Sequence, residues 1–170
     1  RAHRPPPPLR QGQSCGPSVA ALLVGKTSRA AELGIQLKLD GASNLSAEQL
    51  LLPSNVYITI LGNLIENSIE ALNQTPRTPK SILASIREEA RRVFICVEDT
   101  GAGMYPGTVR YIFQQGFSTK ASGRGSGLAL VKEVVDIYQG DLRVESQPGV
   151  GTSFFITFSS PLPESGNQRS

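Results

Sequence analysis

A glycine- and serine-rich run that passes directly into an apolar helix limits the folds open to this chain. The run is Ser118–Gly127, and the residues from Leu128 to about Tyr138 have helical spacing. Backbone amides at the start of a helix favour a bound phosphate. Lys120 and Arg124 lie inside the run and can add charge-assisted hydrogen bonds. The run therefore predicts a phosphate-binding loop.

Two familiar phosphate-binding motifs do not fit this loop. The chain has no GxxxxGK[ST] sequence, and no strand precedes the loop in a βαβ unit. A flexible linker remains an alternative, although it would not explain a helix that starts immediately behind the glycines.

Four polar residues share one face of a helix predicted over residues 54–73. Asn63, Glu66, Asn67 and Glu70 are spaced by three or four positions, and the helix contains no Lys or Arg. Solvated helix faces usually mix charge signs, and Asn is a poor helix former. Amide and carboxylate oxygens are ligands that Mg²⁺ takes. The face is therefore a candidate cation site, with a plain solvated face as the alternative.

An aspartate and two glycines follow a predicted strand at residues 93–97. Asp99 at the end of that strand can accept a hydrogen bond from an exocyclic amine. Gly101 and Gly103 would let the backbone approach a planar ligand. An ordinary turn is the alternative, because Asp and Gly both favour turns.

Hydrophobic periodicity predicts three long helices and five strands. The helices cover residues 17–33, 54–73 and 127–138, and the strands cover 35–39, 82–86, 93–97, 142–145 and 154–158. Ser54 or Asn55 can cap the second helix, and residues 87–92 would form a turn. Because helices and strands do not alternate strictly, we expect an α+β fold. It would be a two-layer sandwich whose mixed sheet is covered on one face by about three helices.

The ends of the chain differ in composition from its middle. Residues 1–16 contain a polyproline run and are expected to be a disordered linker or a vector-derived remnant. Residues 161–170 form a polar tail. The folded domain is therefore expected over residues 17–160.

Charge and cysteine content exclude several classes of protein. The net charge of +3 equals the contribution of Arg1, Arg4 and Arg10, and only 6% of residues are aromatic, so we expect no nucleic-acid binding. Cys15 and Cys96 lack metal-ligand spacing, and Cys96 is expected to be a buried small hydrophobe. No apolar run approaches the roughly 18 residues that a membrane span needs.

The motifs, in this order, resemble those of one family. The segments that match its boxes are Asn63–Asn67, Asp99–Gly103, Ile112–Lys120, Gly125–Leu130 and Gly149–Phe154. The chain resembles the ATP-binding domain of sensor histidine kinases, in the superfamily of gyrase, heat-shock chaperones and MutL, which has the Bergerat fold. Residues 61–72 and 116–120 look like the citrate/C4-dicarboxylate sensor kinases of bacteria.

The resemblance implies roles for individual residues. Asn67 should bind Mg²⁺ beside Asn63, Asp99 should bind the adenine amino group, and Phe113 and Phe117 should anchor a lid. The expected catalytic residues are Asn63, Glu66 and Asn67. The expected contacts to ATP are Asn63, Asn67, Asp99, Gly101, Gly103, Lys120, Arg124, Gly125, Ser126, Gly127, Leu128 and Thr152. Glu70 departs from the family, in which many members have Lys or Arg, and Lys120 is the residue that could compensate.

The resemblance also implies a reaction. ATP hydrolases of the superfamily have a Glu general base where this chain has Asn63, and an amide cannot take a proton at neutral pH. We therefore expect transfer of the γ-phosphoryl group of ATP, with Mg²⁺, to a histidine on a separate dimerisation domain. A superfamily ATPase and a nucleotide-gated interaction module without phosphotransfer are the alternatives.

Partners and location follow from the same resemblance. The expected partners are that dimerisation domain and a cognate response regulator, in a homodimeric parent protein. The domain is expected to be the cytoplasmic part of an inner-membrane sensor and to make no direct membrane contact itself.

Overall fold

The computed structural model describes residues 16–44, 50–76, 79–114 and 126–159. The helices are α1 (Pro17–Glu32), α2 (Ser54–Asn73), α3 (Pro106–Val109) and α4 (Ser126–Ile137). The strands are β1 (Gln36–Leu39), β2 (Ser81–Glu89), β3 (Arg92–Asp99), β4 (Asp141–Gln147) and β5 (Gly151–Phe158).

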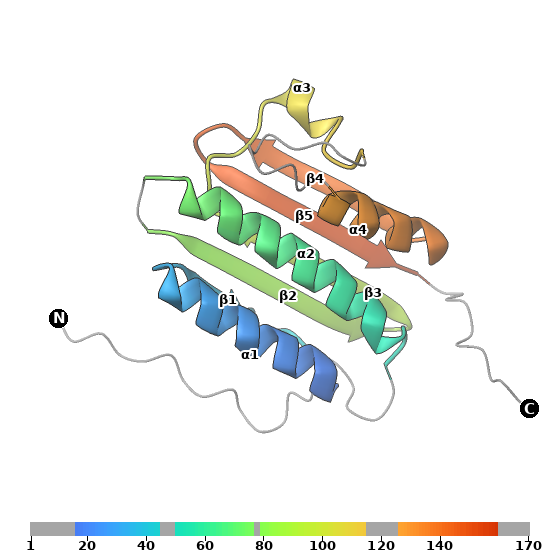
Figure 1. The fold of residues 1–170 in the computed structure, drawn as a ribbon. Helices are drawn as coiled ribbons and strands as arrows, with labels where there is room; N and C mark the ends of the chain where they lie inside the picture. The colour runs from blue at the N-terminus through green and yellow to red at the C-terminus, as the bar shows by residue number, and fades with distance from the viewer. Residues whose placement is uncertain (1–15, 45–49, 77–78, 115–125, 160–170) are drawn as a thin grey trace, which may run out of the picture.

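The five strands form one mixed sheet in the order β1-β2-β3-β5-β4. β1 pairs with β2 in parallel, and the other three pairs are antiparallel. The long helices α1, α2 and α4 lie side by side on one face of this sheet, with α2 in the middle (Figure 1). The short helix α3 lies near one end of the sheet (Figure 1). The expected α+β sandwich, with one face of a mixed sheet covered, is confirmed.

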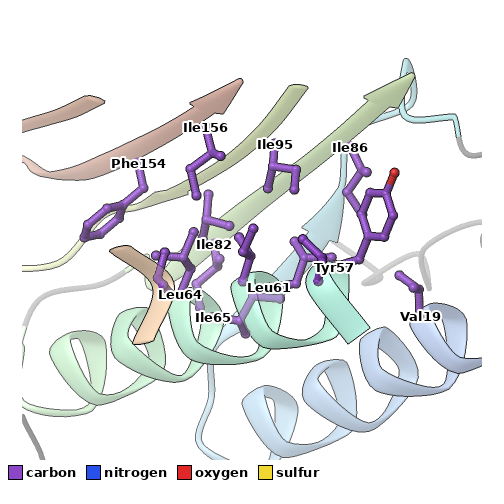
Figure 2. Close-up of a cluster of buried hydrophobic side chains, with 14 of the residues drawn as sticks. Val19, Tyr57, Leu61, Leu64, Ile65, Ile82, Ile86, Ile95, Phe154 and Ile156 are labelled. Atoms are coloured by element: carbon purple, nitrogen blue, oxygen red, sulfur yellow. The ribbon is translucent and has the colours of Figure 1, made fainter. Parts of the chain in front are cut away.

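The core lies between α2 and the inner strands. Leu61, Leu64 and Ile65 of α2 point toward Ile82 and Ile95 of the sheet (Figure 2), and all five are at most 1% exposed. Their spacing along α2 places them on one stripe of the helix. This packing fixes the opposite face of α2, with its asparagines, on the outer side.

A second contact fixes the start of α2. The Tyr57 hydroxyl donates a hydrogen bond to Glu88 of β2, and Glu88 also accepts the Leu51 N–H at 3.1 Å. Burial, followed by this bond, raises the pKa of Tyr57. The expected cap at Ser54 or Asn55 is wrong, because the helix begins at Ser54 with Pro53 at the cap position and no side-chain capping bond.

Strands β2 and β3 are longer than expected. The charged segment 87–92, expected as a turn, instead extends both strands, and Ala90 and Arg91 form the turn with φ of 49° and 59°. Cross-strand pairing holds these charged residues extended, up to the pair Glu89 and Arg92. Two positive φ values match the tight hairpin turns that fit the twist of paired strands.

Cys96 does not lie in the core, contrary to expectation. Residues alternate along β3, so Val93, Ile95 and Val97 face the helices and Cys96 lies half-buried on the other face. Burial against that face still raises the pKa of its thiol to about 12. Periodicity of two, rather than the apolar run as a whole, decides which face each residue takes. In the described part of the chain, no helix is long and apolar enough to cross a membrane.

Candidate functional site

Asp99 is a buried carboxylate at the end of β3. Its side chain is 8% exposed, and it accepts hydrogen bonds from the Gly101 N–H at 2.9 Å and the Ser68 hydroxyl at 3.0 Å. Burial raises the pKa of Asp99, while bonds from Gly101, Ser68 and the Thr152 backbone act in the opposite direction. A buried acceptor of this kind is suited to a ligand N–H group.

Gly101 leaves the Asp99 carboxylate in place. A Cβ at Gly101 would lie 2.9 Å from Asp99 Oδ1 and 3.4 Å from the Cβ of Ala71 on α2. Any side chain there would displace the carboxylate. Glycine at this position therefore preserves the geometry of the acceptor.

A contact within the protein requires glycine at position 103. Its φ is +68°, and a Cβ would lie 2.0 Å from the carbonyl oxygen of Gln147 at the end of β4. The Gly149 N–H also donates to the Ala102 carbonyl at 2.7 Å. The glycine thus allows the loop after β3 to pack against the β4–β5 turn, which is a contact within the protein.

Thr152 lies directly across the ladder from Asp99. Its side chain is 7% exposed, and its hydroxyl oxygen lies 2.8 Å from that of Ser146. Ser146 also accepts the Met104 N–H at 2.8 Å. This hydroxyl pair therefore ties β4 and β5 to the loop that follows Asp99.

Asn63 brings α2 to the start of α4. Its Nδ2 donates to the Thr59 carbonyl at 2.7 Å, which directs Oδ1 away from its own helix turn. That Oδ1 lies 2.8 Å from where a Cβ on Gly127 would be. Both residues line a cleft of about 630 Å³ that runs along α4. An amide oxygen and a helix N-terminus, both expected near phosphates, therefore lie together.

The remaining expected residues lie either on α2 and α4 or outside the described part of the chain. Asn67 is half-buried on α2 one turn beyond Asn63, and Leu128 packs against the core from the first turn of α4. The residues that lie outside the described part of the chain are Phe117, Lys120, Arg124 and Gly125. Ser126 begins α4.

Phe113, an expected anchor of a lid, packs against the core. Its ring meets that of Phe154 edge-on, with centroids 6.3 Å apart. It also lines the cleft beside Asn63. Phe113 therefore links this cleft to the core of the sheet.

Glu66 faces α1 and contacts two of its cations. It accepts a hydrogen bond from Lys26 at 2.9 Å and from Arg29 at 2.7 Å. Burial acts to raise its pKa, but the bonds from Lys26 and Arg29 outweigh burial and hold the pKa below its ordinary value. The cations missing from α2 itself are thus supplied by α1. This carboxylate is therefore engaged by two cations of α1, and its expected catalytic role stays a prediction.

Sequence reasoning missed Ser68 and Ser146. Ser68 had a usable signal, because it falls on the apolar stripe of α2 at Leu61, Ile65 and Leu72 and is itself fully buried. A polar residue on such a stripe needs a partner. Ser146 had no comparable signal, since it lies on an edge strand with alternating exposure.

Comparison of the sequence with known proteins gives consistent matches. The model of the family of histidine kinase-, DNA gyrase B-, and HSP90-like ATPases matches residues 55–162. The sensor histidine kinase DcuS of Escherichia coli (strain K12) is 40% identical over 149 residues, which cover 85% of this chain and 26% of DcuS. A probable C4-dicarboxylate sensor kinase of Halalkalibacterium halodurans is 38% identical over 140 residues, covering 82% of this chain and 26% of that protein. The chain thus spans about a quarter of the length of these relatives.

Solved structures share the fold. Full-length ShkA in complex with AMPPNP matches with a TM-score of 0.64 at 23% identity, over 82% of this chain and 28% of ShkA. The mycobacterial sensor histidine kinase MprB matches with a TM-score of 0.64 at 21% identity, over 82% of this chain and 91% of that chain.

The family model covers more than half of the chain. Its span includes α2 from its second residue, β3 and α4, which carry Asn63, Asp99 and Gly127. The chain therefore belongs to the family of histidine kinase-, DNA gyrase B-, and HSP90-like ATPases, as an ATP-binding domain of the sensor histidine kinase type.

Proposed function

We propose that this domain binds ATP with Mg²⁺ and transfers the γ-phosphoryl group to a histidine on a separate dimerisation domain. In this proposal Asp99 accepts the adenine amino group, and Asn63 and Asn67 lie at the phosphates. Gly127, Leu128 and the neighbouring amides would hold phosphate oxygens.

One observation carries the proposal. α2 lies between a buried acceptor and a helix N-terminus: its inner Ser68 contacts Asp99, and its outer Asn63 lies against Gly127 of α4. A nucleotide has a base with an amino group at one end and anionic phosphates at the other. The two ends of the site match this polarity.

The donor set is compatible with Mg²⁺ that arrives with the nucleotide. Among the described residues, no group of three or more His, Cys, Asp or Glu side chains could hold a metal ion by itself. Mg²⁺ at nucleotide sites is usually held by one or two protein oxygens together with phosphates and water. Asn67 would supply one such oxygen, and the Oδ1 of Asn63, one turn earlier on the same helix, is directed toward Gly127. When bound, the ion would neutralise charge on the phosphates.

The side chains near α4 favour transfer over hydrolysis. Asn63 holds its amide toward the Gly127 end of α4, and an amide cannot act as a general base at neutral pH. Phosphoryl transfer depends mainly on positioning and on charge neutralisation. The domain would therefore hold ATP until another domain presents the accepting imidazole.

The relatives suggest the wider setting. DcuS is named a sensor histidine kinase, and the Halalkalibacterium halodurans relative is named a probable C4-dicarboxylate sensor kinase. We therefore propose a response regulator as the downstream partner. The parent protein would be a homodimeric membrane sensor, with this domain on its cytoplasmic side.

Nucleotide binding tests the proposal most simply. Calorimetry with ATP and Mg²⁺ should show saturable heat, and about 1 mM nucleotide should raise the melting temperature. GTP with Mg²⁺ is the matched control ligand and should bind more weakly. The proposal would be falsified by the absence of both heat and thermal shift with ATP.

A further inference from the structure

Ser68 makes a buried polar contact that the proposed chemistry does not yet use. Its side chain is fully buried on the core stripe of α2. Its hydroxyl donates to Asp99 Oδ2 at 3.0 Å, while the Gly101 N–H donates to Oδ1 at 2.9 Å. The two oxygens of the carboxylate are therefore held from opposite sides, one by α2 and one by the loop after β3.

The two hydrogen bonds differ in their donor and in the sequence distance that they span. The Gly101 bond is donated by a backbone N–H and joins residues only two positions apart. The Ser68 bond joins residues 31 positions apart and is the only hydrogen bond from a side chain to this carboxylate among the described residues. Removal of the Ser68 hydroxyl would leave Oδ2 without that donor and let the carboxylate rotate about its terminal torsion.

The groups around Asp99 explain why the Ser68 hydrogen bond affects the protonation of the carboxylate. The neighbours are Ser68 on α2, Ile82 on β2, Thr152 on β5 and Gly101 in the following loop. None of these four groups carries a charge. Burial raises the pKa of Asp99, and only hydrogen bonds from Gly101, Ser68 and the Thr152 backbone counter it. Loss of the Ser68 bond therefore favours the protonated carboxyl.

The protonation state decides which base the site accepts. An ionised carboxylate only accepts hydrogen bonds, which suits the amino group of adenine and repels the carbonyl oxygen that guanine has at the same ring position. A protonated carboxyl can donate to that oxygen.

We propose that Ser68 is a positioning residue that holds the Asp99 carboxylate as an acceptor for adenine and thereby supports selection of ATP over GTP. The inference rests on the proposed function, in which Asp99 binds the adenine amino group. It adds a residue on α2, outside the expected contacts, as a determinant of base specificity.

The test compares Ser68→Ala with the wild-type chain by calorimetry with Mg²⁺ and ATP or GTP between about pH 5 and about pH 8. At neutral pH the variant should bind ATP about three- to tenfold more weakly, because the acceptor loses a hydrogen bond that orients it before and after ATP binds. The ratio of the variant's dissociation constant to that of the wild type should grow as the pH falls. This ratio cancels the titration of the nucleotide itself. Discrimination against GTP should fall as well.

Ser85→Ala is the matched control. The Ser85 hydroxyl also donates to a carboxylate, Asp40 Oδ2 at 3.2 Å, but Ser85 pairs with Cys96 rather than with Asp99. This control should leave nucleotide affinity unchanged at every pH. Ser68→Cys, which keeps a weak donor of similar size, should give an intermediate pH profile. Melting temperatures without nucleotide show that each variant is folded.

Three outcomes would overturn the inference, and they are distinguishable. If the wild type binds ATP and Ser68→Ala behaves as wild type, the inference fails and the proposed function stands. If Ser68→Ala weakens ATP and GTP by one factor at every pH, Ser68 has only a structural role. If the wild type itself binds no ATP, the proposed function fails and the inference falls with it.

Discussion

Replacement of Asp99 by Asn is expected to weaken ATP binding about ten- to hundredfold. The Asp99 carboxylate already receives the Gly101 N–H and the Ser68 hydroxyl, and it has acceptor capacity left for a ligand. An amide has one oxygen and an NH₂ group, so a donor would face either Ser68 or the amino group of adenine. Calorimetry with ATP and GTP would measure the loss, and discrimination against GTP should decrease too.

A matched substitution separates this effect from a general change in charge. Asp141 is an exposed aspartate at the start of β4, and Asp141→Asn should leave ATP affinity unchanged. Wild-type ATP affinity in Asp99→Asn would refute the role assigned to Asp99.

The stability of Asp99→Asn gives an independent readout. Burial raises the pKa of Asp99 in the folded protein, so this group favours folding below its unfolded pKa and loses that contribution as the pH rises through its folded pKa. At neutral pH the ionised carboxylate therefore opposes folding. The ligand-free variant should melt at the same temperature as the wild type or above it, even though it binds ATP more weakly.

Replacement of Gly151 by Ala is expected to destabilise the fold by roughly 3–5 kcal/mol. Gly151 has a φ of +148°, and a Cβ there would lie 2.0 Å from the Asp99 carbonyl oxygen. The residue can neither accept a side chain in that conformation nor move without disturbing the end of β3. The melting temperature should fall by about 10 °C or more.

Replacement of a second glycine is expected to have the opposite effect on stability. Gly25 lies exposed within α1, and a Cβ there would meet nothing within 4 Å. Gly25→Ala should hold or raise the melting temperature, because Ala is the better helix former by about 1 kcal/mol. Equal melting temperatures for Gly151→Ala and the wild type would show that the backbone at Gly151 is not constrained as described.

The parts of the fold that were predictable from sequence are those with strong local signals. Helix α2 was expected over its observed residues because its apolar stripe is long and regular. The end of α1 was marked by Gly34, which has a φ of +72°. The ends of strands were harder to predict from the sequence, because charged residues such as Arg87 and Glu88 are held extended by pairing with β3. Helix α3 was not expected, because four residues give no periodicity to detect.

The sequence allowed the residues of the candidate site to be predicted, but most of the contacts between them could not be. Asp99, Asn63 and Gly127 were found from motifs, and the fold brings Asn63 and Gly127 together. The partners of a side chain are set by tertiary packing, so the pairing of Glu66 with Lys26 of α1 could not be read from α2. Ser68 is an intermediate case that was missed: a polar residue on an apolar stripe could have indicated a buried partner, but not which residue it is.

Phosphotransfer from radiolabelled ATP tests the central claim most directly. The chain would be incubated with Mg²⁺ and labelled ATP, first alone and then with the separately purified helical dimerisation domain of its kinase. Alone it should acquire no label, because its single histidine, His3, lies beside a polyproline run that cannot form the helix needed to present an acceptor. With the partner, acid-labile label should appear on the partner's histidine, slowly, since the two domains are no longer linked.

Three results of this measurement would contradict the account. Bound ATP without transfer to the partner would indicate an interaction module, and steady phosphate release without the partner would indicate an ATPase. Acid-labile label on the chain alone, abolished by His3→Gln, would show that the acceptor lies in this chain. The account predicts label on the partner only.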